Sequence, residues 1–190
     1  MEAILYFADA NGRSVTAAAL RSIAASPGVN AIDEQQFHAL YNANARPIHA
    51  YLIGVTGNKD VADDVLQETW FRFLQRHPAG MPLEEMRPYL FRIATNLLHD
   101  RWRRGDDLQF QQSDEPSIES HPENVLDATR MLHRLKPRAR ELLWLAYMEG
   151  MTHREIADVT GLNVMSVRIL LLRARREAAA QLKSKGKEYA

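Results

Sequence analysis

Several features are missing from this 190-residue chain, and each absence removes a class of protein. There is no cysteine, which excludes disulfides, thiolate zinc sites and cysteine nucleophiles. No apolar run approaches the roughly 20 residues needed to cross a bilayer, so we expect no stable membrane insertion. The first residues lack a basic stretch followed by an apolar core, so we expect no secretory signal and a cytoplasmic location.

Catalytic signatures and strand patterns are missing as well. The sequence contains no Gly-rich phosphate loop, nucleophile elbow or zinc-protease spacing, so we predict a protein that is not an enzyme and has no catalytic residues. We also expect no metal site and no cofactor. Period-2 alternation of β-branched residues is rare, whereas apolar residues recur at helical spacing along most of the chain, which predicts an all-α fold.

The formal net charge is zero because segments of opposite charge cancel. Residues 106–127 hold seven acidic side chains and no Lys or Arg, whereas residues 128–190 hold thirteen basic and six acidic side chains, a net of +7. A basic module of this kind indicates a possible nucleic-acid partner. Charge balance over the whole chain therefore does not exclude such a partner.

Breaks in the helical pattern along the chain predict two helical domains. Residues 35–104 read as a helical bundle, in which Pro47 kinks or divides the first helix and Pro88 fits the first turn of the last. Residues 105–123 read as an acidic flexible linker, and 124–182 as a second helical domain that starts with a helix near 125–135. Residues 1–34 form an extension of unknown role with an Ala-rich candidate helix at 15–25, and 183–190 form a tail.

The second domain contains the layout of a helix-turn-helix. Thr152 and Glu155 are spaced as a capping box, Gly161 supplies a turn, and a long arginine-rich helix follows from about Val164, which we expect to be braced by Val164 and Val167. The second helix of such a motif enters the major groove of DNA. A plain helical hairpin with a solvated basic face is the alternative.

Two further patterns in the first domain leave alternatives open. Aromatic and arginine residues interleave between positions 88 and 104, which suits stacking on single-stranded nucleic acid or, equally, rings in a core beneath solvated arginines. Carboxylates cluster at positions 60–68, where they suit a solvated helix N-terminus, a docking surface for a basic partner or, least of all, a hard metal ion.

Three segments in this order resemble a known family. They are Asp60-Val-Ala-Asp-Asp-Val-Leu-Gln-Glu-Thr-Trp-Phe71, Pro88-Tyr-Leu-Phe-Arg-Ile-Ala-Thr-Asn96 through Asp100-Arg101, and Leu135-Lys-Pro-Arg followed by Thr152-His-Arg-Glu-Ile-Ala and the arginine-rich helix. Together they are similar to the small bacterial extracytoplasmic-function (ECF) sigma factors of the sigma-70 family, which keep regions two and four. The resemblance covers about residues 35–182.

The resemblance implies a promoter-specificity subunit of bacterial RNA polymerase, with core polymerase, promoter DNA and an anti-sigma factor as partners. Region two would dock on the clamp helices of the β′ subunit through Asp63, Asp64, Gln67 and Glu68. It would open and bind the minus-ten element through Arg92, Asn96, Arg101, Arg103 and Arg104. Region four would contact the β flap and bind the minus-thirty-five element through Ser166, Arg168, Arg173, Arg175 and Arg176. In the free protein the two regions would close on each other or on an anti-sigma factor and hide the DNA-binding faces.

One departure from the family pattern concerns the second helix of the motif. Ile169 and Leu170 stand where Ser-Arg is usual, and Leu172 occupies the variable position that follows. These aliphatic residues either alter promoter preference through thymine methyl groups or form a surface for a protein partner. Two other functions remain open: a helix-turn-helix regulator that binds duplex DNA without polymerase, and a protein-interaction module with no role on DNA.

Overall fold

The computed structural model describes residues 7–8, 14–15, 34–76, 78, 80–105, 132 and 134–186. Within these residues the fold is helical, as predicted, apart from a two-residue antiparallel pairing of β1 (Phe7–Ala8) with β2 (Ser14–Val15). The helices are α2 (Glu34–Thr56), α3 (Lys59–Arg76), α4 (Leu83–Arg104), α6 (Pro137–Tyr147), α7 (His153–Thr160) and α8 (Val164–Gly186). None of the described helices is long and apolar enough to cross a membrane.

Several expected elements differ from the structure or lie outside it. Val15 belongs to β2, so the helix expected to start there is wrong at its first residue, and residues 16–25 lie outside the described part. The linker expected at 105–123 lies outside it except for Gly105, which ends α4 in the left-handed region at φ 67°. The helix expected near 125–135 falls largely on residues that the structure does not describe.

Two prolines of the first domain, Pro47 and Pro88, lie inside helices. Helix α2 continues through Pro47, so the division allowed there does not occur. Helix α4 begins at Leu83, so Pro88 is not in its first turn as expected. Glu84 and Glu85 form that first turn, where negative charge is favourable beside the helix N-terminus. This explains why the helix starts before the proline.

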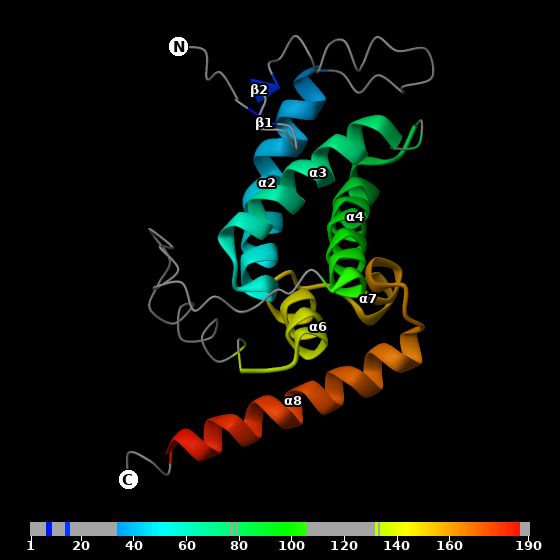
Figure 1. The fold of residues 1–190 in the computed structure, drawn as a ribbon. Coiled ribbons are helices and arrows are strands. Elements are labelled where there is room, and N and C mark those ends of the chain that lie inside the picture. Colours follow the sequence, from blue (N-terminus) through cyan, green and yellow to red (C-terminus); the bar gives the residue numbers. More distant parts are fainter. Residues whose placement is uncertain are drawn as a thin grey trace.

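Helices α2, α3 and α4 form the first module (Figure 1), and their apolar faces meet in one core. The side chains that fill it recur at helical spacing, as in α2, where Ile48, Tyr51, Leu52 and Val55 are buried. Asn58 lies between α2 and α3 and caps the latter, because its Oδ1 accepts a hydrogen bond from the backbone N–H of Val61 at 3.1 Å.

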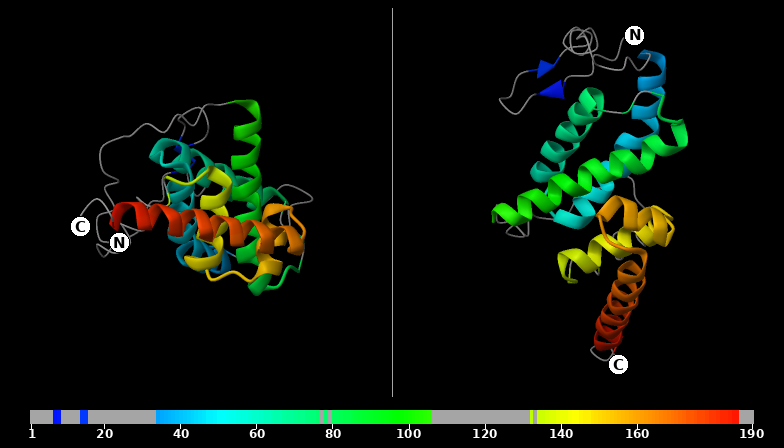
Figure 2. Two further views of the ribbon diagram at one scale, coloured as in Figure 1. Left: turned by 90° about the horizontal axis from the view of Figure 1, so that it is seen from below. Right: turned by 90° about the vertical axis from the view of Figure 1, so that its right-hand side faces the viewer.

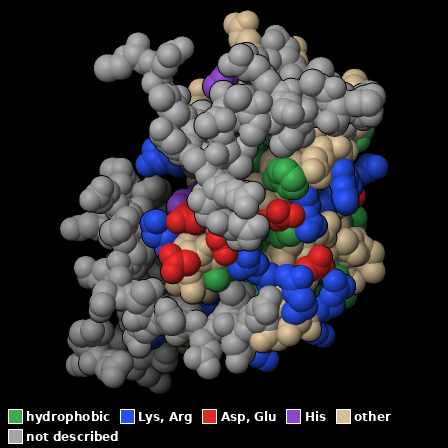
Figure 3. Space-filling model, turned by 45° about the horizontal axis from the view of Figure 1, so that its top comes forward, with side chains coloured by type: hydrophobic (Ala, Val, Ile, Leu, Met, Phe, Trp, Pro, Cys, Tyr) green, Lys and Arg blue, Asp and Glu red, His purple; other side chains and the backbone are tan. Residues whose placement is uncertain are grey.

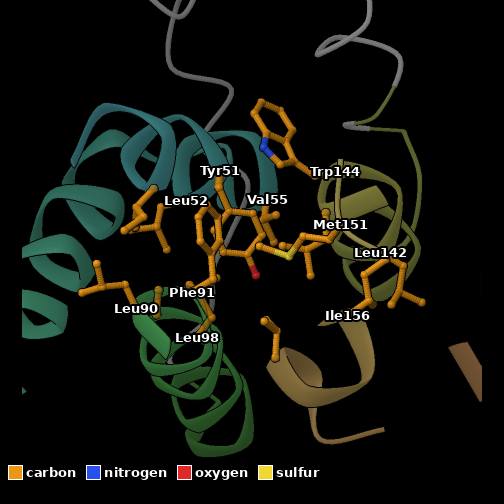
Figure 4. Packing of buried hydrophobic residues seen from close by; sticks show 14 of the residues in the cluster. Tyr51, Leu52, Val55, Leu90, Phe91, Leu98, Leu142, Trp144, Met151 and Ile156 are labelled. Atoms are coloured by element: carbon orange, nitrogen blue, oxygen red, sulfur yellow. The ribbon is translucent and has the colours of Figure 1, made fainter. Parts of the chain in front are cut away.

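Helices α6, α7 and α8 form the second module, which packs directly on the first. Helix α6 contacts α2, and α7 contacts α4. Figure 4 shows Tyr51 and Val55 from the first module facing Leu142, Met151 and Ile156 from the second. Helix α8 contacts α6 and α7 and lies at the end of the molecule opposite the start of α2 (Figure 2). One continuous core therefore joins the two modules.

Candidate nucleic-acid interface

Helices α7 and α8 form the predicted helix-turn-helix, and local side chains fix its geometry. Thr152 Oγ1 accepts a hydrogen bond from the backbone N–H of Glu155 at 3.3 Å, and Glu155 Oε2 accepts one from the backbone N–H of Thr152 at 2.7 Å. The Thr152 hydroxyl also donates to Glu155 Oε2 at 2.7 Å, and this bond, together with the one from the Thr152 backbone N–H, lowers the pKa of the Glu155 carboxyl. Gly161 makes the turn at φ 70°, and Asn163 Oδ1 accepts from the backbone N–H of Ser166 at 2.8 Å, which caps α8.

Helix α8 presents four arginines to solvent. Its buried side chains recur at helical spacing: Val167, Leu171, Ala174 and Ala178. The exposed cations are Arg168, Arg173, Arg175 and Arg176, while Ser166 is half-buried. The structure thus places all five residues expected at the minus-thirty-five element on one helix.

The aliphatic residues of α8 do not share one environment. Leu170 is half-buried and packs against the core, whereas Ile169 and Leu172 are exposed. Val164 is exposed as well, so the expectation that it braces the helix is wrong, whereas Val167 is fully buried and does so. The departure from the family pattern therefore changes the outer surface at Ile169 and the inner surface at Leu170.

Helix α4 carries all five residues expected at the minus-ten element. Arg92 and Asn96 are exposed one helical turn apart, so they share a face. The Arg92 guanidinium lies over the ring of Tyr89, 4.9 Å from its centroid, which limits where this cation can reach. Two others lie near the C-terminus of the helix in ion pairs: Arg101 with Asp64 at 3.3 Å, and Arg103 with Asp100. Arg104 is exposed beside them.

The aromatic residues of α4 belong mainly to the core. Phe91 is fully buried, Tyr89 is half-buried, and the Tyr89 hydroxyl donates to the carbonyl of Arg76 at 3.2 Å. Trp102 is half-buried and its ring lies 5.3 Å from that of His99. Of the two interpretations of this segment, rings in a core beneath exposed arginines fits these three side chains better than a stacking platform for bases.

The carboxylates near the start of α3 are spread among several cations. Asp63 lies 2.6 Å from His49 Nε2 and 3.0 Å from Lys59 Nζ, while Glu68 pairs with Arg72 at 2.7 Å. Asp64 is exposed, and Gln67 is half-buried. In the view of Figure 3, acidic and basic side chains are mixed on the described surface. No group of three or more potential metal ligands occurs among the described residues.

A buried polar network joins the two modules around Glu141 of α6. Its carboxylate is inaccessible to solvent and accepts hydrogen bonds from the Tyr51 hydroxyl at 3.4 Å and from Arg138 Nη1 at 2.6 Å. His99 Nε2 lies 2.8 Å from the same carboxylate, and Thr95 Oγ1 lies 2.8 Å from the Tyr51 hydroxyl. Burial, with Glu141 as the second cause, raises the pKa of Tyr51 well above its usual range.

Two further side chains of α6 fasten it to the first module. Arg140 is buried and donates to the carbonyl of Val55 at 2.7 Å, and burial lowers its pKa to about 10. Trp144 packs directly against Gly54 in α2, and its indole N–H donates to Glu149 at 3.0 Å. We call the contacts made by Glu141, Arg140 and Trp144 with the first module the clasp.

An ion pair extends the clasp along α4. Glu149 accepts from Arg87 Nη2 at 2.7 Å, and the Arg87 guanidinium lies over the ring of Phe91, 5.2 Å from its centroid. Burial raises the pKa of Glu149 despite its contacts with Trp144 and Arg87.

The expectation that closure of the two regions hides the DNA-binding faces does not match this arrangement, because Arg92, Asn96 and the arginines of α8 stay exposed.

Sequence reasoning did not identify the clasp. Its residues lie far apart along the chain: Tyr51 and Glu141 are separated by 90 positions. The local signal is the pair Arg140-Glu141 directly before the apolar run 142–147 of α6, because charge is unusual on a buried face. That signal indicates a buried polar contact but does not say which partner makes it.

The chain matches two models of the sigma-70 family. Residues 40–107 match Sigma-70 region 2, and residues 126–177 match Sigma-70, region 4. The first match covers α3, α4 and most of α2, and the second covers α6, α7 and most of α8.

Curated relatives and solved structures agree with these matches. The chain is 26% identical over 152 residues to the ECF RNA polymerase sigma factor SigM of Bacillus subtilis, covering 74% of this chain and 91% of that protein. It is also 26% identical over 166 residues to SigE of Mycolicibacterium smegmatis, covering 80% of this chain and 63% of that longer protein. The sigma factor RpoE, solved in complex with the anti-sigma factor NepR from Bartonella quintana, has the same fold with a TM-score of 0.63 and 21% identity, covering 78% of this chain and 98% of that one.

Proposed function

The chain belongs to the ECF family of RNA polymerase sigma factors and contains sigma-70 regions 2 and 4, and from this premise we propose how its residues divide the work of promoter recognition. The observation that carries the proposal is the exposure of two separate sets of arginines. One set lies on α4 beside Asn96, and the other on the outer face of α8. Because each module carries its own set of cations, the chain suits two contacts with one DNA molecule.

Region 2 is proposed to bind the minus-ten element after its strands separate. Asn96 offers an amide that can donate to and accept from the edge of an unpaired base, while Arg92 binds the adjacent phosphate. Extracting a base from the stack costs a few kcal/mol, which these contacts offset. Arg101, Arg103 and Arg104 extend the positive face toward the end of α4.

Region 4 is proposed to bind the minus-thirty-five element as duplex DNA. Helix α8 enters the major groove, where Arg168, Arg173, Arg175 and Arg176 contact phosphates. Ser166 is close to the capped start of the helix, where backbone N–H groups favour a phosphate. These assignments rest on exposure and on the position of each residue along α8.

Binding both elements at once requires the clasp to open. The two elements are about 25 base pairs apart, or about 85 Å along straight duplex at about 3.4 Å per base pair. A compact chain of this length has a radius of gyration of only about 16 Å. With α6 packed on α2 and α7 on α4, the two DNA-binding helices cannot reach this separation. We therefore assign the packed arrangement to the protein before it engages a promoter.

Core polymerase is the partner proposed to hold the opened form. The carboxylates of Asp63, Asp64 and Glu68, with Gln67, would dock on the basic clamp helices of the β′ subunit, and region 4 would contact the β flap. The ion pairs that these carboxylates make within the chain are exposed and therefore weak, so a basic partner can replace them. An anti-sigma factor is a further proposed partner, by analogy with the complex of RpoE with NepR. A cytoplasmic location follows from the polymerase partner.

Transcription in vitro tests this assignment. The full-length chain and core polymerase are incubated with fragmented genomic DNA of the native host, and transcripts that start at discrete sites are expected. Asn96→Ala and Arg92→Ala should reduce initiation about tenfold or more on duplex templates, since each removes a contact worth about 1–3 kcal/mol. Arg46→Ala, which removes an exposed arginine from α2, is the matched control and should behave like the parent chain.

Failure can take two distinct forms. No promoter-dependent initiation from any template would mean that the proposed mechanism is wrong. Tight, specific binding of the free chain to duplex DNA, unchanged by core polymerase, would favour a regulator that acts without polymerase. If Asn96→Ala and Arg92→Ala lose no more activity than the control Arg46→Ala, the minus-ten contacts lie elsewhere on region 2.

A further inference from the structure

The outer face of α8 begins with three exposed apolar side chains, which we call the apolar stripe. Met165 is 62% exposed, and Ile169 and Leu172 are each 45% exposed. Their spacings of four and three residues bring them within about 60° of one another, since an α-helix turns about 100° per residue. Val167 and Ala174, which are buried, lie on the opposite side of the helix. The stripe therefore points directly away from the core.

Arginines border the stripe on both sides. At the same angular increment, Arg168 and Arg175 lie about 60–80° to one side of Met165, and Arg173 lies about 80° to the other. Arg176 continues the line of the stripe toward the C-terminus. All four are exposed, so an apolar strip is enclosed by cations on the outermost surface of this helix.

We propose that the apolar stripe binds the C5-methyl groups of thymines in the minus-thirty-five element; this rests on the proposed function of region 4. An α-helix about 10–12 Å across fits the major groove, which is about 12 Å wide. Its outermost face then meets the base edges, while cations to either side meet the phosphate backbones. Thymine methyl is the apolar group that the major-groove base edges offer.

The length of the stripe sets how many base pairs it covers. From Met165 to Leu172 the helix rises about 10 Å at about 1.5 Å per residue. This distance matches about three base pairs at about 3.4 Å each. The stripe therefore selects thymines within a window of three successive base pairs, on either strand.

The bordering charges favour DNA over a protein as the occupant. Phosphates lie on both sides of a helix that sits in the major groove, and the arginines lie on both sides of the stripe. A stable protein interface buries about 800 Å² on each partner, which is more than three partly exposed side chains offer. Leu170 does not extend the patch, because it packs against the core.

The first step of the test is a selection. Holoenzyme assembled from the full chain and core polymerase selects templates from a pool in which only the minus-thirty-five segment is randomised. A window of three base pairs enriched in thymine is expected. No enrichment anywhere in the segment would overturn both this inference and the proposed role of region 4, whereas enrichment without thymine would overturn the inference alone.

The second step replaces the selected thymines by uracil, which keeps every hydrogen-bonding group and removes the methyl. Affinity of the holoenzyme should fall about fourfold for each methyl in contact, the value of one buried methylene-sized group. Ile169→Ser and Leu172→Ser should each bind the thymine template more weakly. Each variant should also lose the preference for thymine over uracil at one base position. Leu83→Ser, which changes an exposed apolar residue on α4, is the control and should keep the full distinction.

Each remaining result has one meaning. Equal affinity of the parent holoenzyme for thymine and uracil templates would overturn the inference while leaving region 4 binding intact. Persistence of the distinction in both serine variants would show that other side chains contact the methyls. Unchanged DNA binding with loss of holoenzyme assembly in the serine variants would show that the stripe binds a protein.

Discussion

Gly54 is the position at which a single methyl group should separate the two modules. A Cβ atom built on this glycine would lie 2.0 Å from Cζ3 and 2.4 Å from Cε3 of Trp144. No carbon can approach so closely, so the indole of Trp144, which is only 5% exposed, would have to leave its site. Gly54→Ala therefore acts on the clasp, although it introduces the residue with the highest helix propensity into α2.

Two opposing terms set the size of this effect. Replacing Gly by Ala inside a helix stabilises that helix by up to about 1 kcal/mol. Complete loss of a buried aromatic side chain from its site costs about 3–5 kcal/mol. The packed state should therefore lose about 2 kcal/mol or more relative to the separated state, a shift of about 30-fold in their ratio. The helices of the first module should meanwhile be no less stable.

The lack of cysteine makes this shift directly measurable. Cysteines introduced at Asn42 of α2 and Ala179 of α8, both exposed, take a pair of fluorophores with no background labelling. Energy transfer between them reports the separation of the modules. Gly54→Ala should lower the transfer efficiency at a temperature where the helix content, measured by circular dichroism, is unchanged.

A second substitution supplies the control. When Trp144 is first replaced by Ala, the space above Gly54 becomes free, so adding Gly54→Ala should no longer lower energy transfer and should slightly stabilise α2. This reversal of sign is specific to the steric contact between the two residues. If Gly54→Ala leaves energy transfer unchanged in the parent chain, then Trp144 does not hold the modules together and the clasp is not the dominant arrangement in solution.

Three other predictions concern protonation, capping and docking. Burial raises the pKa of Tyr51, so the contribution of the neutral hydroxyl to stability is present below pH 10.0 and is lost as the pH rises above that value. Energy transfer should therefore fall in alkali, and in Tyr51→Phe it should fall only at a higher pH. Thr152→Ala should lower the free energy of unfolding, measured by chemical denaturation, by about 1 kcal/mol. It should also reduce the loss of stability that occurs below pH 4.5 as Glu155 is protonated. Asp64→Ala should weaken binding to core polymerase in a salt-dependent manner without lowering the melting temperature, because its pair with Arg101 is exposed; a lower melting temperature would show that this pair is structural.

The helix-turn-helix was predictable because its signals are local. The Thr152–Glu155 capping box and Gly161 with positive φ fix where α7 starts and stops, and both act within a few residues. Asn163, which caps α8, lies directly before it. Chain-local hydrogen bonds of this kind leave a sequence pattern that does not depend on what the helix later packs against.

The environment of individual side chains was less predictable. Ile169 and Leu170 are adjacent and chemically alike, yet one is exposed and the other packs against the core. Phe91 suited either a base-stacking platform or a core, and its ring lies 5.5 Å from that of Tyr51 in α2. In both cases the outcome depends on which neighbouring helix covers a face, and that is a tertiary contact with no local signal.

Under the proposed function, the packed state limits DNA binding through the distance between the two sites rather than through their burial. Arg92 and Asn96 on α4 and Arg168 on α8 remain exposed while the clasp is closed, so on the proposed assignment each module stays free to contact DNA by itself. Joining two weak sites by a linker raises affinity by about 10²–10⁴ only when both can bind together. The clasp prevents this by holding the sites too close for one promoter. A partner that separates α6 from α2 therefore restores joint binding without uncovering any new DNA-binding residue.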